Sequence, residues 1–485
     1  MFTANSPSAL DPAVCEQARL TRDARFDGLF YTAVTTTGIY CRPVCPAPAP
    51  KPRNIVYYAN AAAAAAAGFR PCLRCRPEAA PGSPLHRARS ELVAGALRLI
   101  EQGALDRATL PDLARRIGVG ERHLRRLFAL ELGASPLDVA ATRRLLFAKQ
   151  LLSDTALPVT EIAAAAGYAS LRRFNAAFLD AYAKPPREFR RGRVGARDDD
   201  ALRLRIGYRP PYDFAALLAF YARRAIAGIE HVDETGYRRS FVIDGEAGWF
   251  EVSRSADEDA LTLRVRGLRT SALGQLVSRV RRMFDVDADP VAIGNVLSKA
   301  ALTRALVRRW PGQRLPGAWD GFELAVRAVL GQQVSVAAAR TLAARLVQRY
   351  GAAFSGLDEV DALFPEPATL ADAPLETIGL PRARAQTIRV LAQACMDGRI
   401  EFGPEQPLDA FVQRLCALPG IGAWTAHYIA MRALSHPDAF PAGDLVLRKI
   451  AGGEKPLPQP QLEALAEAWR PWRAYAVFLL WRSAG

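Results

Sequence analysis

The sequence has little of several features that mark other protein classes. Its unbroken apolar runs, such as the alanine stretch at 61–67, are far too short to span a bilayer. The N-terminus is polar and lacks the hydrophobic core of a signal peptide. Cysteine is scarce, with seven residues in 485, and an odd count without a signal peptide argues against a disulfide framework. We therefore expect a cytoplasmic protein with no membrane association.

Acidic residues are too few to balance the basic ones. The formal net charge is +15 and the pI is near 9.8. Residues 1–197 carry 29 Lys and Arg against 16 Asp and Glu, whereas residues 198–485 carry 35 against 33. Most of the cations are arginine, which binds phosphate bidentately. A basic excess confined to the front predicts a nucleic-acid partner, here double-stranded DNA. The alternative is a general contribution to solubility.

The length of the chain predicts several domains, because one hydrophobic core does not serve 485 residues. The Pro/Gly/Ser-rich segment PEAAPGSP ends a first piece, and the polar segment RGRVGARDDDA follows a second. Alternating segments such as SFVIDG, WFEVSR and LTLRVRG predict strands in a third piece, while the second and fourth have helical periodicity. The expected domains are 1–83, 84–192, 202–312 and 313–485.

Two cysteine pairs lie near the start of the chain. They are Cys41-x3-Cys45 in CRPVC and Cys72-x2-Cys75 in RPCLRC. Two close pairs of thiolates on turns are typical of a tetrahedral zinc site. We expect one zinc ion held by all four cysteines, and no organic cofactor. The spacing leaves two roles open: a closed structural site, or a site in which zinc keeps one thiolate reactive.

Residues 30–77 resemble the N-terminal domain of the Ada adaptive-response family. The similarity rests on TTGIYCRP, on YYANA, where Asn60 is a plausible N-cap for a helix at 61–67, and on AAGFRPCLRC. The resemblance implies that Cys41 accepts a methyl group from a methylphosphotriester in DNA, while Cys45, Cys72 and Cys75 complete the zinc site. Methylation would remove a negative charge from Cys41 and strengthen DNA binding.

Residues 110–133 and 159–191 each have the sequence pattern of a helix-turn-helix. In the first, Gly118 makes the turn and a second helix begins at Glu121; in the second, Gly167 makes the turn. Two such units would place two helices in successive major grooves. The arginines expected to face DNA are Arg122, Arg125, Arg126, Arg172 and Arg173. The alternative is a helical bundle with solvated arginine faces.

The segment AYAKPPREFRR, which closes the second of these units, resembles the C-terminal DNA-binding domain of the AraC family. Ada proteins carry such a domain after their zinc domain, so the two resemblances agree in order. Together they imply that the chain binds promoter DNA and regulates transcription, with RNA polymerase as a further partner.

The segment LPGIG at 418–422 places Gly420 and Gly422 at a turn between two helical patterns. Backbone N–H groups without neighbouring side chains can approach a phosphate closely. This arrangement is typical of a helix-hairpin-helix that binds DNA, and a plain αα-hairpin is the alternative. Downstream, AFPAGDLVLRKI places Asp444 at the start of an amphipathic helix, where an N-cap is its ordinary role.

Residues 203–485 resemble the alkylation-repair glycosylase AlkA of the helix-hairpin-helix superfamily. The similarity includes YRPPYDFAALLAFYARRAI, LPGAWDGFELAVRAVLGQQVS and WRPWRAYAVFLLW. It implies an α+β N-terminal domain and an all-α glycosylase domain, so the whole chain is expected to be multidomain and mainly α with an α+β part. The implied reaction is hydrolysis of the N-glycosidic bond of 3-methyladenine-type bases. Asp444 would stabilise the oxocarbenium-like transition state.

The same resemblance implies an aromatic pocket that stacks on a flipped cationic base. Its expected members are Trp424, Tyr428, Trp481 and Phe220, although each of them has core packing as an alternative role. Glycosylases that also cut the strand have a lysine at the position of Trp424. Without an amine there no Schiff base can form, so we expect a monofunctional enzyme.

The sequence departs from the family at two positions. GQQVS has Gln333 where an apolar residue can enter the DNA stack, and Gly443 precedes Asp444 where an acidic residue can occur. Both departures leave the range of excised bases open. The segment PCHR, which marks guanine-O6 methyltransferases, is absent, so we do not expect that activity.

The main expectation is a monomeric chain that both repairs DNA alkylation and responds to it. One alternative is a transcription factor whose glycosylase-like half is an inactive DNA clamp. Another is an active glycosylase whose front half only tethers it to DNA.

Overall fold

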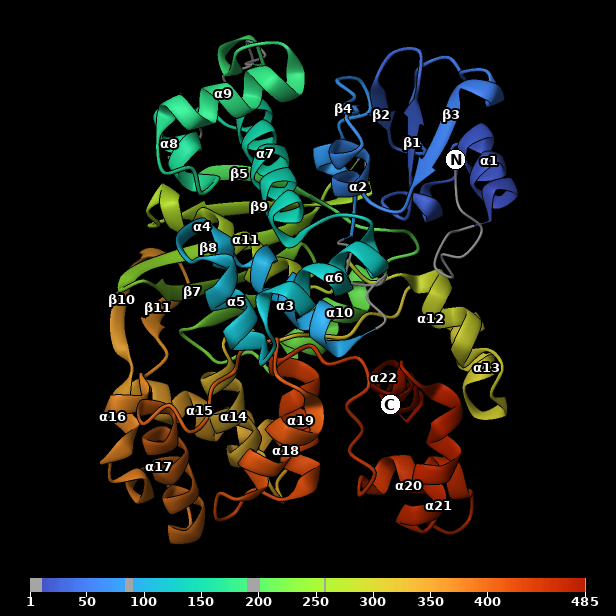
Figure 1. Cartoon of the computed structure of the whole chain (residues 1–485). Helices are drawn as coiled ribbons and strands as arrows, with labels where there is room; N and C mark the ends of the chain where they lie inside the picture. Colours follow the sequence, from blue (N-terminus) through green and yellow to red (C-terminus); the bar gives the residue numbers. More distant parts are fainter. Residues whose placement is uncertain (1–10, 83–89, 190–200, 257–258, 485) are drawn as a thin grey trace. The chain divides into compact units, whose positions relative to one another are not determined.

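The computed structural model of the chain describes residues 11–82, 90–189, 201–256 and 259–484 (Figure 1). The boundary predicted near residue 83 and most of the linker predicted at 191–201 lie outside these residues. The chain divides into two compact units. Unit 1 comprises Met1–Pro210, Ser255–Ser278 and Val286–Ala288, and unit 2 comprises Pro211–Arg254, Arg279–Asp285 and Asp289–Gly485. The finer division into four domains stays a prediction.

Unit 1 begins with a small four-stranded sheet in the order β3-β1-β2-β4. Strand β1 is antiparallel to both β2 and β3, whereas β2 and β4 are parallel. The predicted helix after Asn60 is confirmed, and the Asn60 side chain caps it by accepting a hydrogen bond from the N–H of Ala63 at 2.8 Å. The elements are α1 (Pro12–Thr21), β1 (Tyr31–Val34), β2 (Ile39–Cys41), β3 (Ile55–Tyr58), α2 (Ala61–Ala66) and β4 (Arg70–Pro71).

A run of helices follows in the same unit. The two predicted turns are confirmed, because Gly118 and Gly167 have left-handed backbones with φ of 82° and 81° and each follows a short helix. Leucine and phenylalanine side chains such as Leu113, Leu124 and Phe128 form the core of the first helix-turn-helix. The helices are α3 (Glu91–Glu101), α4 (Ala104–Arg107), α5 (Leu110–Ile117), α6 (Glu121–Leu132), α7 (Pro136–Asp154), α8 (Val159–Ala165) and α9 (Leu171–Tyr182).

Polar contacts join the small sheet to the helices of unit 1. Lys149 on α7 is 3% exposed and donates from Nζ to Oε2 of Glu78 at 2.7 Å. Arg76 forms an ion pair of 2.7 Å with Asp154 at the end of the same helix. Charged groups are rarely buried unless they are paired. These pairs therefore fix the cysteine-bearing segment against α7. Unit 1 also holds β5 (Leu202–Gly207), antiparallel to β9 (Ala260–Arg266).

Unit 2 combines strands with a helical region. The strands predicted from SFVIDG and WFEVSR are confirmed as parts of β7 and β8, and that predicted from LTLRVRG is β9 of unit 1. Strands β6 (Glu230–Val232), β7 (Gly236–Ile243) and β8 (Glu246–Arg254) pair antiparallel in sequence order. The helices used below are α10 (Phe214–Ala222), α14 (Gly321–Leu330), α15 (Val336–Tyr350), α17 (Arg382–Met396), α18 (Leu408–Cys416), α19 (Ala423–Ala433), α20 (Leu445–Gly452) and α22 (Arg473–Ser483).

A buried ionic network fixes α14 against the strands of unit 2. Arg239 on β7 is 2% exposed and pairs with Glu323 on α14 at 2.7 Å. Arg327, one turn further along α14, pairs with Glu230 of β6 and with Glu323, each at 2.9 Å. Removing one member would leave a buried charge unpaired, which costs about 3–5 kcal/mol.

The helical region differs in one respect from the expected all-α domain. A hairpin of β10 (Ala352–Leu357) and β11 (Val360–Leu363) follows α15. Gly351 ends α15 with an extended backbone, and a Cβ there would lie 2.6 Å from two carbonyl oxygens. The chain therefore leaves α15 directly into a strand. Within the described residues, no helix is both long and apolar enough to cross a membrane.

Candidate functional site

The parallel pairing of β2 with β4 brings the two cysteine pairs together. Cys41 ends β2, and Cys72 follows β4 with its N–H bonded to the carbonyl of Tyr40 at 3.0 Å. The four Sγ atoms of Cys41, Cys45, Cys72 and Cys75 all lie within 4.8 Å of one another. Four thiolates at this spacing suit a tetrahedral zinc ion. In the part of the chain that the structure describes, no other cluster of His, Cys, Asp and Glu has this geometry.

The four cysteines differ in exposure and in their neighbours. Cys72 and Cys75 are buried at 6% and 5% exposure, while Cys41 and Cys45 are half-buried. The N–H of Arg42 donates to Sγ of Cys75 at 3.3 Å, and the Arg42 side chain forms an ion pair with Asp27 and donates to the carbonyl of Cys75 at 2.9 Å. Such outer contacts orient metal ligands. Cys41 is thus more accessible than Cys72 and Cys75.

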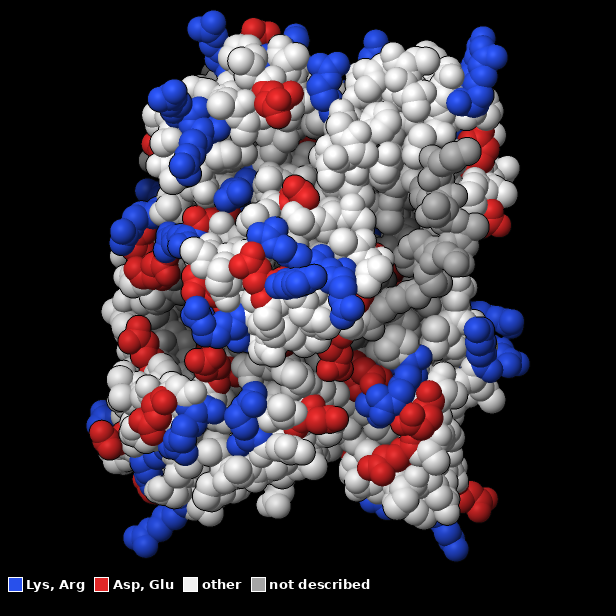
Figure 2. All heavy atoms as spheres, viewed as in Figure 1, with Lys and Arg blue, Asp and Glu red and all other residues white. Residues whose placement is uncertain are grey.

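The predicted DNA-facing arginines lie on the exposed faces of α6 and α9, where Figure 2 shows basic side chains. Arg122, Arg125 and Arg126 project from α6, and Arg172 and Arg173 project from the first turn of α9. Arg125 pairs with Glu121 of its own helix at 2.7 Å. Ser170 caps α9 by accepting from the N–H of Arg173 at 3.3 Å. Each of the two helices therefore follows a glycine turn and exposes arginines near its N-terminus.

The predicted hairpin is formed by α18 and α19. Gly420 has a left-handed backbone with φ of 84°, and a Cβ there would lie 2.0 Å from Oγ1 of Thr387 on α17. Gly422 is the N-cap of α19, and the space around it is open. Both glycines are exposed. The turn therefore presents bare backbone N–H groups at the N-terminus of α19, which favours binding of a phosphate.

A five-residue loop at 331–335 separates α14 from α15 and contains Gln333. Gln333 is exposed and has a left-handed backbone with φ of 56°, which is unusual for a residue with a side chain. Gln332 ties this loop to the hairpin, because its Nε2 donates to the carbonyl of Gly420 at 2.9 Å and to Oγ1 of Thr425 at 3.2 Å. Strain of this kind gathers at functional positions.

The carboxylate of Asp444 has two roles at once. As the N-cap of α20, it accepts at Oδ1 from the N–H of Leu447 at 2.9 Å. Two indoles also donate to it: Trp481 Nε1 to Oδ1 at 3.1 Å and Trp424 Nε1 to Oδ2 at 2.9 Å. Asp444 is 8% exposed. The cap and the indoles fix the carboxylate in one orientation, with Oδ2 accepting a single hydrogen bond from the protein.

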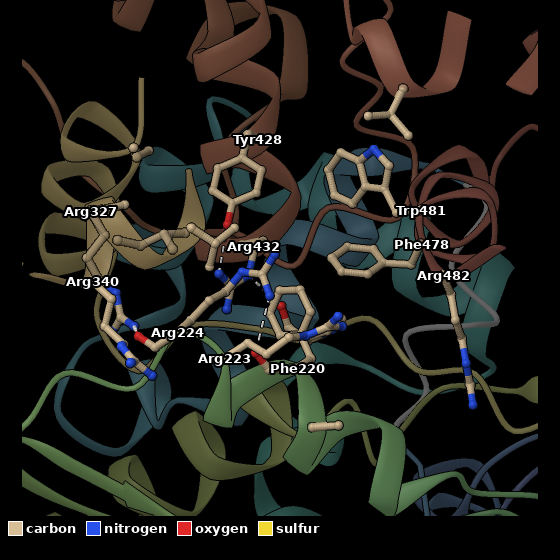
Figure 3. Close-up of a pocket in the computed structure, with 18 of the residues that line it drawn as sticks. Phe220, Arg223, Arg224, Arg327, Arg340, Tyr428, Arg432, Phe478, Trp481 and Arg482 are labelled. Carbon is tan, nitrogen blue, oxygen red and sulfur yellow. Dashed lines mark hydrogen bonds between the residues drawn. The ribbon is translucent and has the colours of Figure 1, made fainter. Parts of the chain in front are cut away.

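The predicted aromatic residues and Asp444 line one cavity of about 760 Å³. The rings of Trp424 and Tyr428 are stacked, with centroids 5.4 Å apart and planes 5° apart. The centroids of Tyr428 and Trp481 are 6.3 Å apart. Figure 3 shows Tyr428, Trp481 and Phe220 converging from different elements. The structure thus brings together all five residues that the sequence analysis assigned to this site.

Comparison with known proteins identifies the family. A protein of Mycobacterium tuberculosis named "Probable bifunctional transcriptional activator/DNA repair enzyme AlkA" is 40% identical over 478 residues, which cover 96% of this chain and 95% of that protein. This chain belongs to the bifunctional AlkA family. A second relative, named "Bifunctional transcriptional activator/DNA repair enzyme Ada", from Escherichia coli K12, is 45% identical over 120 residues, which cover 25% of this chain and 32% of that protein.

Further similarities of this bifunctional AlkA family member cover separate segments of the chain. Four family models match: "Metal binding domain of Ada" at 14–78, "Helix-turn-helix domain" at 113–192, "AlkA N-terminal domain" at 203–320 and "HhH-GPD superfamily base excision DNA repair protein" at 326–473. "DNA-3-methyladenine glycosylase 2" of Escherichia coli K12 is 32% identical over 283 residues, covering 58% of this chain and 97% of that protein. A 3-methyladenine DNA glycosylase structure from Archaeoglobus fulgidus has a TM-score of 0.51 at 21% identity, covering 57% of this chain and 96% of that chain. That last likeness shows the fold alone.

The sequence analysis missed three residues that line the cavity of this bifunctional AlkA chain. Phe478 packs between Phe220 and Trp481, with ring centroids 5.5 and 5.2 Å away. Arg432 and Arg224 lie beside Tyr428 and Phe220 (Figure 3). Arg432 comes four residues after Tyr428, so both lie on one face of α19. This spacing was the signal that could have identified Arg432.

The arginines change the acidity of the tyrosine. Arg432 donates from Nη1 to the hydroxyl oxygen of Tyr428 at 3.0 Å. Burial opposes ionisation of the phenol, but the positive charges of Arg432 and Arg224 outweigh it and lower the pKa of Tyr428 to about 8. Tyr428 is therefore more acidic than an ordinary tyrosine.

Proposed function

We propose that this chain is a DNA glycosylase that hydrolyses the N-glycosidic bond of alkylated bases of the 3-methyladenine type. The observation that carries the proposal is the Asp444 carboxylate, held by two indole N–H groups on the wall of an aromatic cavity. The names of the Mycobacterium and Escherichia relatives support the same reaction.

The proposed chemistry needs a carboxylate close to the anomeric carbon. The bond from C1′ to the base nitrogen breaks and its electron pair stays on the base, which leaves positive charge on the sugar. Asp444 stabilises that charge through Oδ2, since Oδ1 is occupied by the cap and by Trp481. A water molecule then bonds to C1′ and loses a proton. The products are the free base and an abasic site.

Aromatic stacking gives the proposed selectivity for alkylated bases. A cationic purine attracts the face of an aromatic ring by about 0.5–2 kcal/mol. Trp424, Tyr428 and Trp481 offer such rings, and the base reaches them after it leaves the duplex. No lysine lies on α19 or among the lining residues. A monofunctional reaction without strand cleavage follows, because no amine is available to form a Schiff base.

Two neighbouring loops form the proposed binding surface for damaged DNA. The backbone at Gly420 and Gly422 binds a phosphate at the N-terminus of α19. Gln333 enters the duplex and fills the gap left by the flipped base. The hydrogen bonds of Gln332 to the hairpin hold these two parts in register.

The front of the chain is proposed to accept a methyl group from a DNA methylphosphotriester. Cys41, Cys45, Cys72 and Cys75 would hold one zinc ion, whose contribution is to keep the thiolates deprotonated at neutral pH. The thiolate of Cys41 attacks the methyl carbon, the bond from that carbon to the phosphate oxygen breaks, and a phosphodiester anion leaves. Exposure separates Cys41 and Cys45 from the buried Cys72 and Cys75, and the resemblance to the Ada domain assigns the reaction to Cys41. No organic cofactor takes part.

The helix-turn-helix pair is proposed to read promoter DNA. The exposed arginines of α6 and α9 face two successive major grooves, and loss of a negative charge at Cys41 strengthens that binding. The protein acts as a monomer and engages RNA polymerase at the promoter.

Product analysis tests both reactions. Incubation with methylated duplex DNA should release free 3-methyladenine and leave strands that break only after alkali. Absence of free base contradicts the glycosylase, and breakage without alkali contradicts the monofunctional reaction. With methylphosphotriester DNA, fragment mass spectrometry should find one methyl group on Cys41 and none in Cys41→Ser, while Cys416→Ser, at an exposed cysteine outside the cluster, stays active.

A further inference from the structure

The cavity wall beneath the aromatic rings is basic. The guanidinium carbons of Arg224 and Arg432 lie 3.9 and 4.8 Å from the ring centroid of Phe220. The π system of Phe220 therefore already interacts with two cations. Phe220 lines the cavity as the sequence predicts, but its ring is poorly suited to hold a third cation.

Arg432 is a buried cation with neutral partners. It is 5% exposed, and it donates from Nε to the carbonyl of Pro316 and from Nη2 to the carbonyl of Gly317, both at 2.9 Å. Its remaining hydrogen bond goes to Tyr428. Among the described residues no acidic side chain forms an ion pair with Arg432 or with the half-buried Arg224, whereas the neighbouring Arg327 is paired with two glutamates. Buried charges are normally paired.

The hydroxyl of Tyr428 is an acidic group in direct hydrogen-bond contact with Arg432. The charged side chains that line the cavity with Tyr428 are Arg223 and Arg224 after α10, Arg327 on α14, Arg340 on α15, Arg432 on α19, Asp444 before α20 and Arg482 on α22. Of these, Arg432, Arg224 and Arg327 act directly on its hydroxyl group. Glu230 and Glu323 already neutralise Arg327, and Asp444 is engaged by the two indoles. The phenol therefore sits in a positive field, and this field lowers its pKa to about 8 against the effect of burial.

We propose, resting on the glycosylase function above, that Tyr428 ionises to become the counter-charge of Arg224 and Arg432, and that this ionisation sets the preference of the pocket for cationic over neutral bases. Ionisation releases the phenol proton to solvent and leaves the electron pair on the oxygen. With Tyr428 neutral, two unpaired guanidinium groups oppose a cationic base. With Tyr428 ionised, the ring stacked on Trp424 carries negative charge and attracts that base.

Ionisation of Tyr428 should change the affinity for the substrate more than the rate of the chemical step. Positive charge moves from the base to the sugar as the glycosidic bond breaks, so the phenolate stabilises the bound substrate more than the transition state. The half-saturating DNA concentration should therefore change with pH while the maximal rate changes little. Arg224 and Arg432 act through Tyr428 and are positioning residues.

A spectroscopic titration tests the ionisation without requiring any activity. The near-ultraviolet phenolate absorbance of the whole protein is measured against pH, and the curve of Tyr428→Phe is subtracted to isolate one of the 13 tyrosines. The difference should titrate near pH 8. Arg224→Gln should move that titration towards pH 10, whereas Arg382→Gln, at an exposed arginine of α17 outside the cavity, should leave it in place. A difference that titrates at pH 10 or above in the wild type overturns the proposal.

Single-turnover kinetics test the consequence for selectivity. The probes are duplexes carrying one cationic 3-methyladenine and, as competitor, one neutral 3-deaza isostere of it. From pH 7 to pH 9 the half-saturating concentration of the cationic duplex should fall about fivefold relative to the inhibition constant of the neutral one. This ratio should stay constant in Tyr428→Phe. Equal pH profiles in both proteins overturn the selectivity. Absence of base release at all pH values refutes the glycosylase instead, and the titration still tests the ionisation.

Discussion

The indole of Trp424 donates from Nε1 to Oδ2 of Asp444 at 2.9 Å while its ring stacks on Tyr428. One side chain thus joins the surface proposed to hold the base to the carboxylate proposed to stabilise the sugar cation. Trp424 therefore holds the stacking surface and the carboxylate in a fixed position relative to each other.

Trp424→Phe should separate these two contributions. Phenylalanine keeps a stacking ring but loses the N–H, so the carboxylate is less firmly oriented. We expect the single-turnover rate to fall about tenfold, which corresponds to one hydrogen bond to a charged group, with little change in the half-saturating DNA concentration. A rate equal to that of the wild type would contradict the orienting role, and Trp472→Phe serves as a control outside the cavity.

The shifted acidity of Tyr428 should also appear in stability. The folded phenol loses its proton near pH 8, whereas the unfolded phenol keeps it to about pH 10. Between these values the unfolded state binds more protons, so the free energy of unfolding rises with pH. From pH 7 to 9.5 the wild type should gain roughly 1–2 kcal/mol relative to Tyr428→Phe. Urea unfolding followed by tryptophan fluorescence checks this, and parallel pH dependences of the two proteins would count against it.

Gln333 should matter for opening the duplex. Gln333→Ala shortens the group proposed to fill the DNA gap, and we expect excision from duplex DNA to fall about tenfold, since unstacking costs a few kcal/mol. Gln333→Leu should restore most of the rate, because a leucine side chain fills the gap by apolar contact. Fluorescence of 2-aminopurine beside the lesion measures the opening. Normal opening of the duplex by Gln333→Ala would show that Gln333 does not fill the gap.

Removal of zinc should separate the two halves of the function. All the cysteines of the cluster lie in unit 1, and every residue that lines the aromatic cavity lies in unit 2. A strong chelator should abolish methyl transfer to Cys41 and leave base release within about twofold of its starting rate, because metal binding stabilises only the segment that supplies the ligands. Parallel loss of both activities on chelation would contradict this independence.

Local sequence signals accounted for elements that local chemistry decides. Asn60 caps α2 as predicted, and Gly118 and Gly167 make the turns of the two helix-turn-helix units. Asp444 shows that two interpretations of one residue need not compete, because the same carboxylate caps α20 and accepts from two indoles. The capping role was evident from the residues that follow Asp444. The pocket aromatics came from a resemblance, since residues separated by over two hundred positions meet there.

Other features depended on tertiary contacts that the pattern does not encode. Helical periodicity after Trp310 did not reveal the β10–β11 hairpin, whose strands pair with each other directly after α15. The sequence analysis assigned no role to Arg224 or Arg432, which lie against Phe220 and Tyr428. Their effect on Tyr428 depends on distances between α10, α14 and α19 that only the fold supplies.

The most direct measurement is the single-turnover rate of 3-methyladenine release by Asp444→Asn, with binding of the same duplex measured in parallel. Asparagine is as good an N-cap as aspartate, so α20 should persist, and Asp397→Asn at an exposed site is the matched control. The account predicts a loss of at least about 10²-fold in rate with unchanged duplex affinity, since only the charge that stabilises the sugar cation is removed. An undiminished rate of base release by Asp444→Asn would contradict it.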